Sequence, residues 1–244
     1  MPTIAEKLVT ISENIPKVYE AGKVSGSGSG DSYYDEFWDA YQENGNRNQY
    51  IYAFAGRGWT DVSFKPKYTI NCGTGTMYMF SGTNIENLDT SKLDTSKVVR
   101  YSYMFAGNTT TTTTKNIGAL DISSATQIDY IFNYCTRLEV IDLLKFPSNP
   151  TQITGATNAF QKCEKLREIR IDGVIGVGLD FKWSVDLSAD SLKSIVEHLS
   201  DSVTGQTLTL PTTAESTYNA KYGEGAWATL IAPIINWTFA YQGV

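Results

Sequence analysis

The chain has 244 residues, with 26 acidic against 20 basic side chains and a formal net charge of −6. This balance, with no cluster of basic residues, excludes a surface that binds nucleic acid by neutralising phosphates. Three cysteines spread along the chain exclude the disulfide framework of a small secreted domain. The many threonines, serines and glycines are typical of a chain rich in strands and turns.

The first expected element is a helical stem over residues 1–23. Its apolar side chains recur at spacings of four and three, which places them on one stripe of a helix that Pro16 bends. The stripe either packs on the chain's own domain or joins copies in a coiled coil. Because a flexible Gly/Ser linker follows at 24–30, we expect a homo-oligomer, with a trimer favoured. The stripe consists of Ile4, Leu8, Ile11, Ile15 and Val18.

Residues 31–70 are predicted to form an aromatic N-terminal cap. Tyr34, Phe37, Trp38 and Tyr41 recur at helical spacing, and the aromatic segment 50–59 follows. These aromatic side chains either pack against each other or form a platform that binds sugar. Their helical, internal spacing favours packing.

Residues 71–185 contain an internal repeat. Its anchoring phenylalanines lie 25, 27 and 28 residues apart, a period too short for an independent core but suited to one turn of a solenoid. The predicted fold is therefore an α/β repeat in which a short solenoid carries a parallel sheet. The expected core residues are Phe80, Phe105, Phe132, Phe160, Cys135, Cys163, Leu138, Ile141, Leu166 and Ile169.

The run Thr109 to Thr114 lengthens one repeat, so we expect it to bulge outward. Residues 186–244 are predicted to form a C-terminal α/β cap that covers the last repeat. Its elements are a helix over 187–199 with Ser188 as N-cap, a strand over 206–210 ended by Pro211, a helix over 227–235 and a strand over 237–241.

No residue pattern indicates catalysis, so we expect no catalytic site, metal or cofactor. The single histidine, His198, reads as a surface residue of a helix rather than a general base. The recurring Asp89, Asp121 and Asp142 could pair as in a glycosidase, although a turn-capping role explains their recurrence better. Residues 225–244 carry no charge, but Pro233 and the polar residues around it argue against a membrane span.

The repeat frame Met/Ile-Phe-x-x-Cys-x-x-Leu-x-x-Ile-Asp-Leu, with Leu88-Asp-Thr-Ser-Lys-Leu-Asp-Thr-Ser-Lys-Val98, resembles the BspA-like leucine-rich repeats of bacterial surface proteins. Segments 3–22, 37–46, 58–61 and 64–68 resemble the leaders of repeat proteins encoded by phages and prophages of gut Firmicutes. The resemblance implies a leucine-rich-repeat solenoid on a virion or cell-surface appendage, without catalytic residues. The polythreonine run and residues 145–150 depart from this frame.

These features together predict a non-enzymatic protein associated with a phage virion, of the tail-fibre or head-fibre type. It would present its repeats to a host-surface protein or glycan and would contact other virion proteins. Since the first residues do not resemble a signal peptide, we expect it to be made in the host cytoplasm. The alternatives are a BspA-like adhesin on the bacterial cell surface and a glycan hydrolase on a repeat scaffold.

Overall fold

The computed structural model describes residues 69–83, 85–107 and 114–243. This part of the chain is a mixed α/β structure with parallel sheets and few helices. The predicted stem with its stripe (Ile4, Leu8, Ile11, Ile15 and Val18), the linker, nearly all of the aromatic cap and most of the polythreonine run lie outside the described residues.

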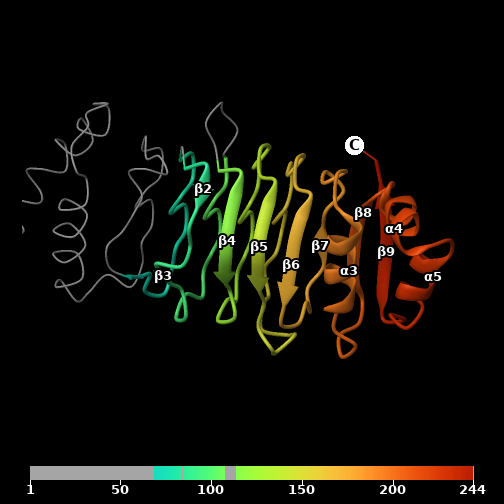
Figure 1. Cartoon of the computed structure of the whole chain (residues 1–244). Helices are drawn as coiled ribbons and strands as arrows, with labels where there is room; N and C mark the ends of the chain where they lie inside the picture. The colour runs from blue at the N-terminus through green and yellow to red at the C-terminus, as the bar shows by residue number, and fades with distance from the viewer. Residues whose placement is uncertain (1–68, 84, 108–113, 244) are drawn as a thin grey trace, which may run out of the picture.

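The main sheet has four parallel strands in the order β2-β4-β5-β6, which lie side by side in Figure 1. These strands are β2 (Asn87–Leu88), β4 (Asn116–Asp121), β5 (Val140–Lys145) and β6 (Glu168–Asp172). Each repeat contributes one strand, and Leu88, Ile117, Ile141 and Ile169 stand opposite one another along the sheet. Strands β1 (Ile70–Asn71) and β3 (Leu93–Asp94) form a separate parallel pair.

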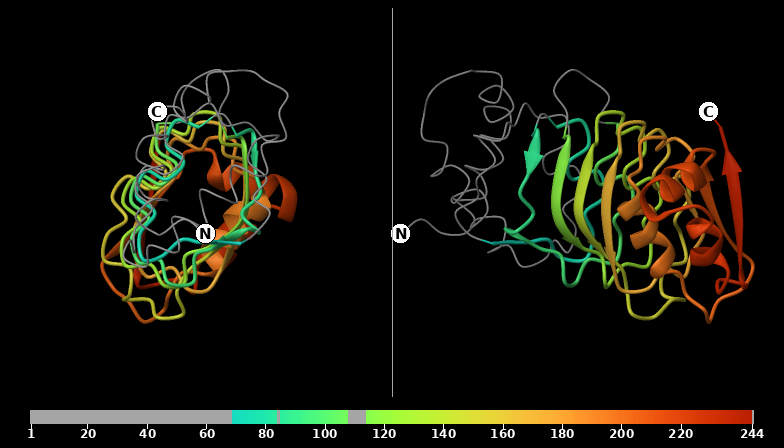
Figure 2. Two further views of the ribbon diagram at one scale, coloured as in Figure 1. Left: turned by 90° about the vertical axis from the view of Figure 1, so that its left-hand side faces the viewer. Right: turned by 45° about the vertical axis from the view of Figure 1, so that its right-hand side comes forward.

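A second set of parallel contacts joins the repeats away from this sheet. Isolated bridges connect Gly75, Arg100, Gln127 and Gly155 in sequence. In the left view of Figure 2 the strands superimpose on one side and the turn segments on the other. Successive repeats are therefore hydrogen-bonded to each other on more than one side.

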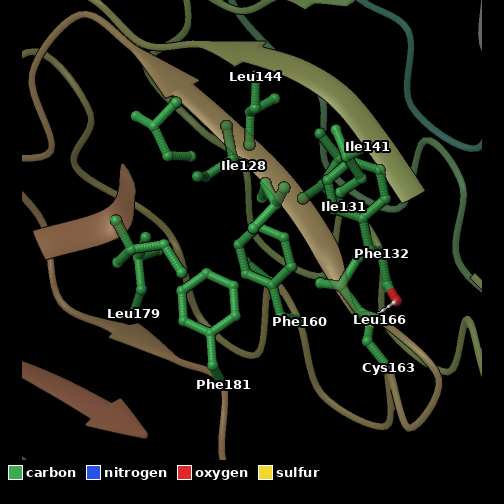
Figure 3. Packing of buried hydrophobic residues seen from close by; sticks show 14 of the residues in the cluster. Ile128, Ile131, Phe132, Ile141, Leu144, Phe160, Cys163, Leu166, Leu179 and Phe181 are labelled. Carbon is green, nitrogen blue, oxygen red and sulfur yellow. Dashed lines mark hydrogen bonds between the residues drawn. The ribbon is translucent and has the colours of Figure 1, made fainter. Parts of the chain in front are cut away.

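The core between these two sides contains a stack of phenylalanine rings. The ring centroids of Phe80, Phe105, Phe132 and Phe160 are separated by 5.6, 5.3 and 5.3 Å, and all four side chains are fully buried. Phe181 extends the stack at 4.3 Å from Phe160 (Figure 3). The repeat spacing does not predict Phe181, because this residue follows Phe160 after only 21 residues.

At β6 the main sheet ends against a helix, α3 (Ala189–Glu197). The hydroxyls of Ser191 and Ser194 accept hydrogen bonds from the backbone N–H groups of Ile169 and Ile171, at 2.9 and 2.8 Å. They supply acceptors that a further strand would otherwise supply. Ser188 caps this helix by accepting from the Ser191 N–H, as the sequence predicts.

The chain then forms a three-stranded parallel sheet and two more helices. The strands β7 (Leu179–Asp180), β8 (Gln206–Pro211) and β9 (Trp237–Gln242) pair in that order. Helices α4 (Ala214–Tyr222) and α5 (Ala226–Ile231) connect β8 to β9. Helix α5 is shorter than the predicted 227–235 because Pro233 cannot continue it. Within the described ranges, no helix has the length and apolar character needed to cross a membrane.

Candidate functional site

Six non-glycine residues of the described chain have a positive φ angle, between 51° and 63°. This left-handed conformation costs about 1–2 kcal/mol per residue for side chains other than glycine. All six lie in the turns that precede and follow the buried phenylalanines. We call this region the tyrosine edge, and its left-handed residues are Tyr78, Tyr103, Tyr130, Asn158, Tyr134 and Lys162.

The first row of the tyrosine edge consists of Tyr78, Tyr103 and Tyr130, each two residues before a core phenylalanine. Their partly exposed rings stack at 4.7 and 4.6 Å with 7° between planes. Each backbone N–H donates to the next repeat, Tyr78 to Ser102, Tyr103 to Asp129 and Tyr130 to Thr157. A ring stack contributes about 0.5–1.5 kcal/mol beyond area burial, which offsets part of the left-handed strain.

The second row lies four residues further along each repeat, at Gly82, Gly107, Tyr134 and Lys162, which are all left-handed. Gly107 donates its N–H to Asn133 O, and Tyr134 donates to Gln161 O, so consecutive members lie in adjacent repeats. The phenol of Tyr134 is 45% exposed. Among the described residues, a Cβ placed on Gly107 would lie 3.8 Å from Ser81 Oγ, which is an ordinary van der Waals distance.

A cation–aromatic contact continues the second row. Lys162 Nζ lies 3.2 Å from the ring centroid of Trp183 and 3.5 Å from the Glu164 carboxylate. Such contacts contribute roughly 0.5–2 kcal/mol, depending on exposure. Trp183 Nε1 is buried and has no hydrogen-bond partner within the described part of the chain. The lysine charge is therefore already balanced by a ring face and a carboxylate.

Amide and carboxylate side chains of the same turns hydrogen-bond between neighbouring repeats. Asn133 Nδ2 donates to Gln161 Oε1 at 2.7 Å. Asp129 accepts from the Thr157 N–H at 2.8 Å, and a Cβ on Gly155 would overlap this carboxylate. Desolvation of the phenol, with the neighbouring phenols and Asp129, raises the pKa of Tyr103. The tyrosine edge thus combines neutral phenols and amides on a rigid backbone.

The predicted core residues lie inside the molecule rather than at this edge. Phe80, Phe105, Phe132, Phe160, Leu138, Ile141, Leu166 and Ile169 are at most 1% exposed. The thiols of Cys135 and Cys163 each donate to a phenylalanine carbonyl of the preceding repeat, at 3.1 Å. Burial raises the pKa of the Cys72 thiol to about 12 and also raises the pKa of Cys163. These protonated thiols are unsuited to nucleophilic chemistry.

Three carboxylates of the sheet side have a structural role. Asp89, Asp94 and Asp121 accept the backbone N–H two residues further on, from Ser91, Ser96 and Ser123. The bond from the Ser91 N–H lowers the pKa of Asp89, and bonds from the Ser96 hydroxyl and N–H lower the pKa of Asp94. Burial alone would raise the pKa of Asp121, but bonds from Ser123 and the Lys145 charge lower it.

The recurring aspartates Asp89, Asp121 and Asp142 do not all occupy equivalent positions in the sheet. Because Leu88 stands opposite Ile117 and Ile141, Asp89 aligns with Gly118 and Asp142 instead. Asp121 stands opposite Lys145 in β5. The hydroxyl of Thr95, the residue after Asp94, donates to the backbone carbonyl of Asp121. Asp142 lies exposed within β5, so its role differs from the turn-capping aspartates.

His198 has a backbone carbonyl as its nearest polar partner, Ser194 O at 2.7 Å from Nδ1. Among the residues that the structure describes, no group of histidine, cysteine and acidic side chains could hold a metal ion. The tyrosine edge was missed by the sequence analysis. Its signal is the tripeptide Tyr-Met/Ile-Phe, repeated at 78–80, 103–105 and 130–132.

Residues 73–172 match a family model. The family is described as "Mycoplasma protein of unknown function, DUF285". The match spans the four stacked phenylalanines and both rows of the tyrosine edge up to Lys162, and it ends with β6. It is consistent with a BspA-like protein, and its description assigns no activity. No curated protein and no solved structure matches the chain.

Proposed function

We propose that the chain is a non-enzymatic binding protein whose repeats form a leucine-rich-repeat solenoid. The observation that carries the proposal is the tyrosine edge, where partly exposed aromatic side chains occupy strained backbone positions. Such strain persists only where surrounding structure enforces it, and it concentrates at ligand-contacting sites. A scaffold held by hydrogen bonds between repeats presents these side chains with little further ordering on binding.

The contacts between consecutive repeats support the proposed solenoid. One parallel strand per repeat, the bridges from Gly75 to Gly155 and the stacked phenylalanines all join neighbours in sequence order. Each repeat buries its apolar residues against the next one. This is the arrangement expected when a unit of about 25–30 residues cannot form a core alone.

Non-enzymatic function is supported by the chemistry of the described side chains. The cysteines are buried, and the turn aspartates have lowered rather than raised pKa values. A glycosidase needs two carboxyl groups held in different environments, one of them kept protonated. Asp89, Asp94 and Asp121 share one structural role, in which the carboxylate accepts the backbone N–H two residues further on.

We further propose that the protein is part of a phage virion, where it contacts other virion proteins and a host-surface protein or glycan. The resemblance of the N-terminal segments to leaders of phage-encoded repeat proteins supports this location. Several copies joined through the stem would convert weak single contacts into avidity. The second candidate is a BspA-like adhesin on the bacterial cell surface, as the resemblance of the repeats to BspA-like surface proteins implies.

Mass spectrometry of purified phage particles, beside the cell-wall fraction of the same culture, tests the location. We expect the chain in the particles together with capsid and tail proteins. Its presence only in the cell-wall fraction would support the adhesin instead. Incubation of the full chain with host-wall polysaccharide tests the absence of enzyme activity, because newly released reducing ends would contradict it.

A further inference from the structure

Tyr134 is the tyrosine of the tyrosine edge whose left-handed conformation is not offset by a stacking interaction with another described aromatic ring. Its φ angle is 57°, yet no ring stack with another described aromatic residue compensates the strain. The equivalent positions in the two preceding repeats are glycines, Gly82 and Gly107, which adopt this conformation without strain. A tyrosine at this position is therefore unfavourable for folding alone.

The ring of Tyr134 is also accessible. Its side chain is 45% exposed, and the neighbouring repeat offers no side chain at the equivalent Gly107. In the first row, by contrast, the faces of the Tyr103 ring are covered by Tyr78 and Tyr130. Tyr134 is thus the tyrosine of this edge best suited to accept a ligand on its ring face.

The groups around Tyr134 are polar but carry little uncompensated charge. The Asn133 and Gln161 amides are paired with each other and retain further donor and acceptor capacity. The Lys162 ammonium is balanced by the Trp183 ring and Glu164. An anionic ligand would find no uncompensated cation among these groups, whereas an uncharged ligand rich in hydroxyls finds neutral amides in the same turns.

We propose that Tyr134 is the centre of a carbohydrate-binding site that takes an uncharged pyranose. The C–H groups on one face of such a sugar carry a small positive charge, which the negative face of an aromatic ring attracts. The hydroxyls at the sugar rim bond to the Asn133 and Gln161 amides. This site deepens the proposed function, because it assumes that the tyrosine edge is the binding surface and specifies the ligand class.

Because the backbone of Tyr134 is left-handed, a glycine substitution can remove the ring without destabilising the fold. Tyr134→Gly removes the ring and relieves the strain, so the variant should be at least as stable as the parent chain in urea unfolding. On a printed array of uncharged glycans, we expect the binding of Tyr134→Gly to be at least about tenfold weaker than that of the parent chain. Tyr134→Phe keeps the ring face and should retain binding. Tyr222→Ala, which removes a 39% exposed tyrosine from α4, is the matched control and should also retain binding.

Equal array binding by the parent chain and Tyr134→Gly would overturn the site. Binding to intact Firmicutes cells separates this failure from failure of the proposed function. Cells treated with periodate should lose binding, whereas cells treated with protease should keep it. Loss of binding after protease treatment but not after periodate treatment would identify a protein ligand. That result would contradict the carbohydrate site but not the proposed binding function. Failure to bind untreated cells and the array would overturn both proposals.

Discussion

Individual residues of this chain show how a repeat tolerates unfavourable local choices. Tyr78, Tyr103 and Tyr130 adopt a conformation that glycine and asparagine prefer, and Asn158 does occupy the same position in the next repeat. The tyrosines remain because their rings stack on one another. Ring stacking between repeats therefore offsets part of the strain at each left-handed tyrosine. This stabilisation requires a tyrosine at the same position of the neighbouring repeat.

A second residue-scale feature is the turn that follows the strands. Asn71 fills the same role as Asp94, since Asn71 Oδ1 accepts the Gly73 N–H at 3.0 Å and Asp94 Oδ1 accepts the Ser96 N–H at 3.1 Å. The two residues stand opposite each other in β1 and β3. The turn therefore needs an acceptor oxygen, not a charge.

Asp94→Asn should consequently preserve the turn while changing its response to pH. Because folding lowers the pKa of Asp94, its contribution to stability is present above the unfolded value of about 3.9 and is lost as pH falls through the folded value. We expect the parent chain to lose more stability than Asp94→Asn between pH 5 and about pH 2 in urea titrations. An identical acid loss in both chains would contradict this role. Asp186→Asn, at an exposed aspartate outside these turns, serves as control.

At the scale of elements, α3 decides where the main sheet stops. Parallel strands expose N–H and C=O groups at each edge, and an uncovered edge invites further pairing. Here Ser191 accepts from Ile169 and donates to the Arg167 carbonyl at 3.1 Å, while its side chain is buried. The serine side chain thus substitutes for the backbone of a strand and allows the chain to change from strand to helix.

Ser191→Ala should therefore destabilise the protein by about 1–3 kcal/mol, because it leaves the buried N–H of Ile169 without its acceptor, whereas the Arg167 carbonyl still accepts from the Ser188 N–H. The measurement is the free energy of unfolding in urea, with far-UV circular dichroism as the signal. Ser216→Ala, on the exposed side of α4, is the control and should change stability by less than about 0.5 kcal/mol. A similar small change for Ser191→Ala would show that water or another group satisfies the edge of β6.

For the whole molecule, the phenylalanine stack links all repeats from Phe80 to Phe181. A ring removed from its middle leaves a cavity whose walls belong to three repeats, so the walls cannot collapse independently. Phe132→Ala should reduce the free energy of unfolding by about 3–5 kcal/mol. Val185→Ala, at a 39% exposed valine, should have little effect in the same urea titration. A loss below about 1 kcal/mol for Phe132→Ala would contradict the stack as the main source of cohesion.

The assembly of the whole molecule depends on the predicted stem, which lies outside the described residues. If Ile4, Leu8, Ile11, Ile15 and Val18 form a coiled-coil stripe, Leu8→Asp with Ile11→Asp should place charges in its seam and disperse the oligomer. Mass photometry of the full chain should then show a shift from oligomer to monomer. A monomer already in the parent chain would remove the stem as an oligomerisation element.

Much of the element order was predictable from local patterns. Ser188 followed by an apolar helical stripe predicts α3, and the alternating segment 206–210 predicts β8, because capping and periodicity depend on neighbours in sequence. The end of α5 was predicted too late, although Pro233 marks it. Phe181 was missed because the repeat shortens where the chain enters its C-terminal sheet.

The recurring residues can be identified from the amino-acid sequence, since their period of about 25–28 residues is visible without coordinates. The alignment of the repeats, in which Ile117 stands opposite Leu88, depends on contacts between segments that are distant in sequence. The insertion at 108–114 shifts the numbering, so register depends on hydrogen bonds between repeats rather than on spacing. The tyrosine edge likewise cannot be predicted from the sequence. Its side-chain directions depend on left-handed backbone conformations, which the residue type alone does not reveal.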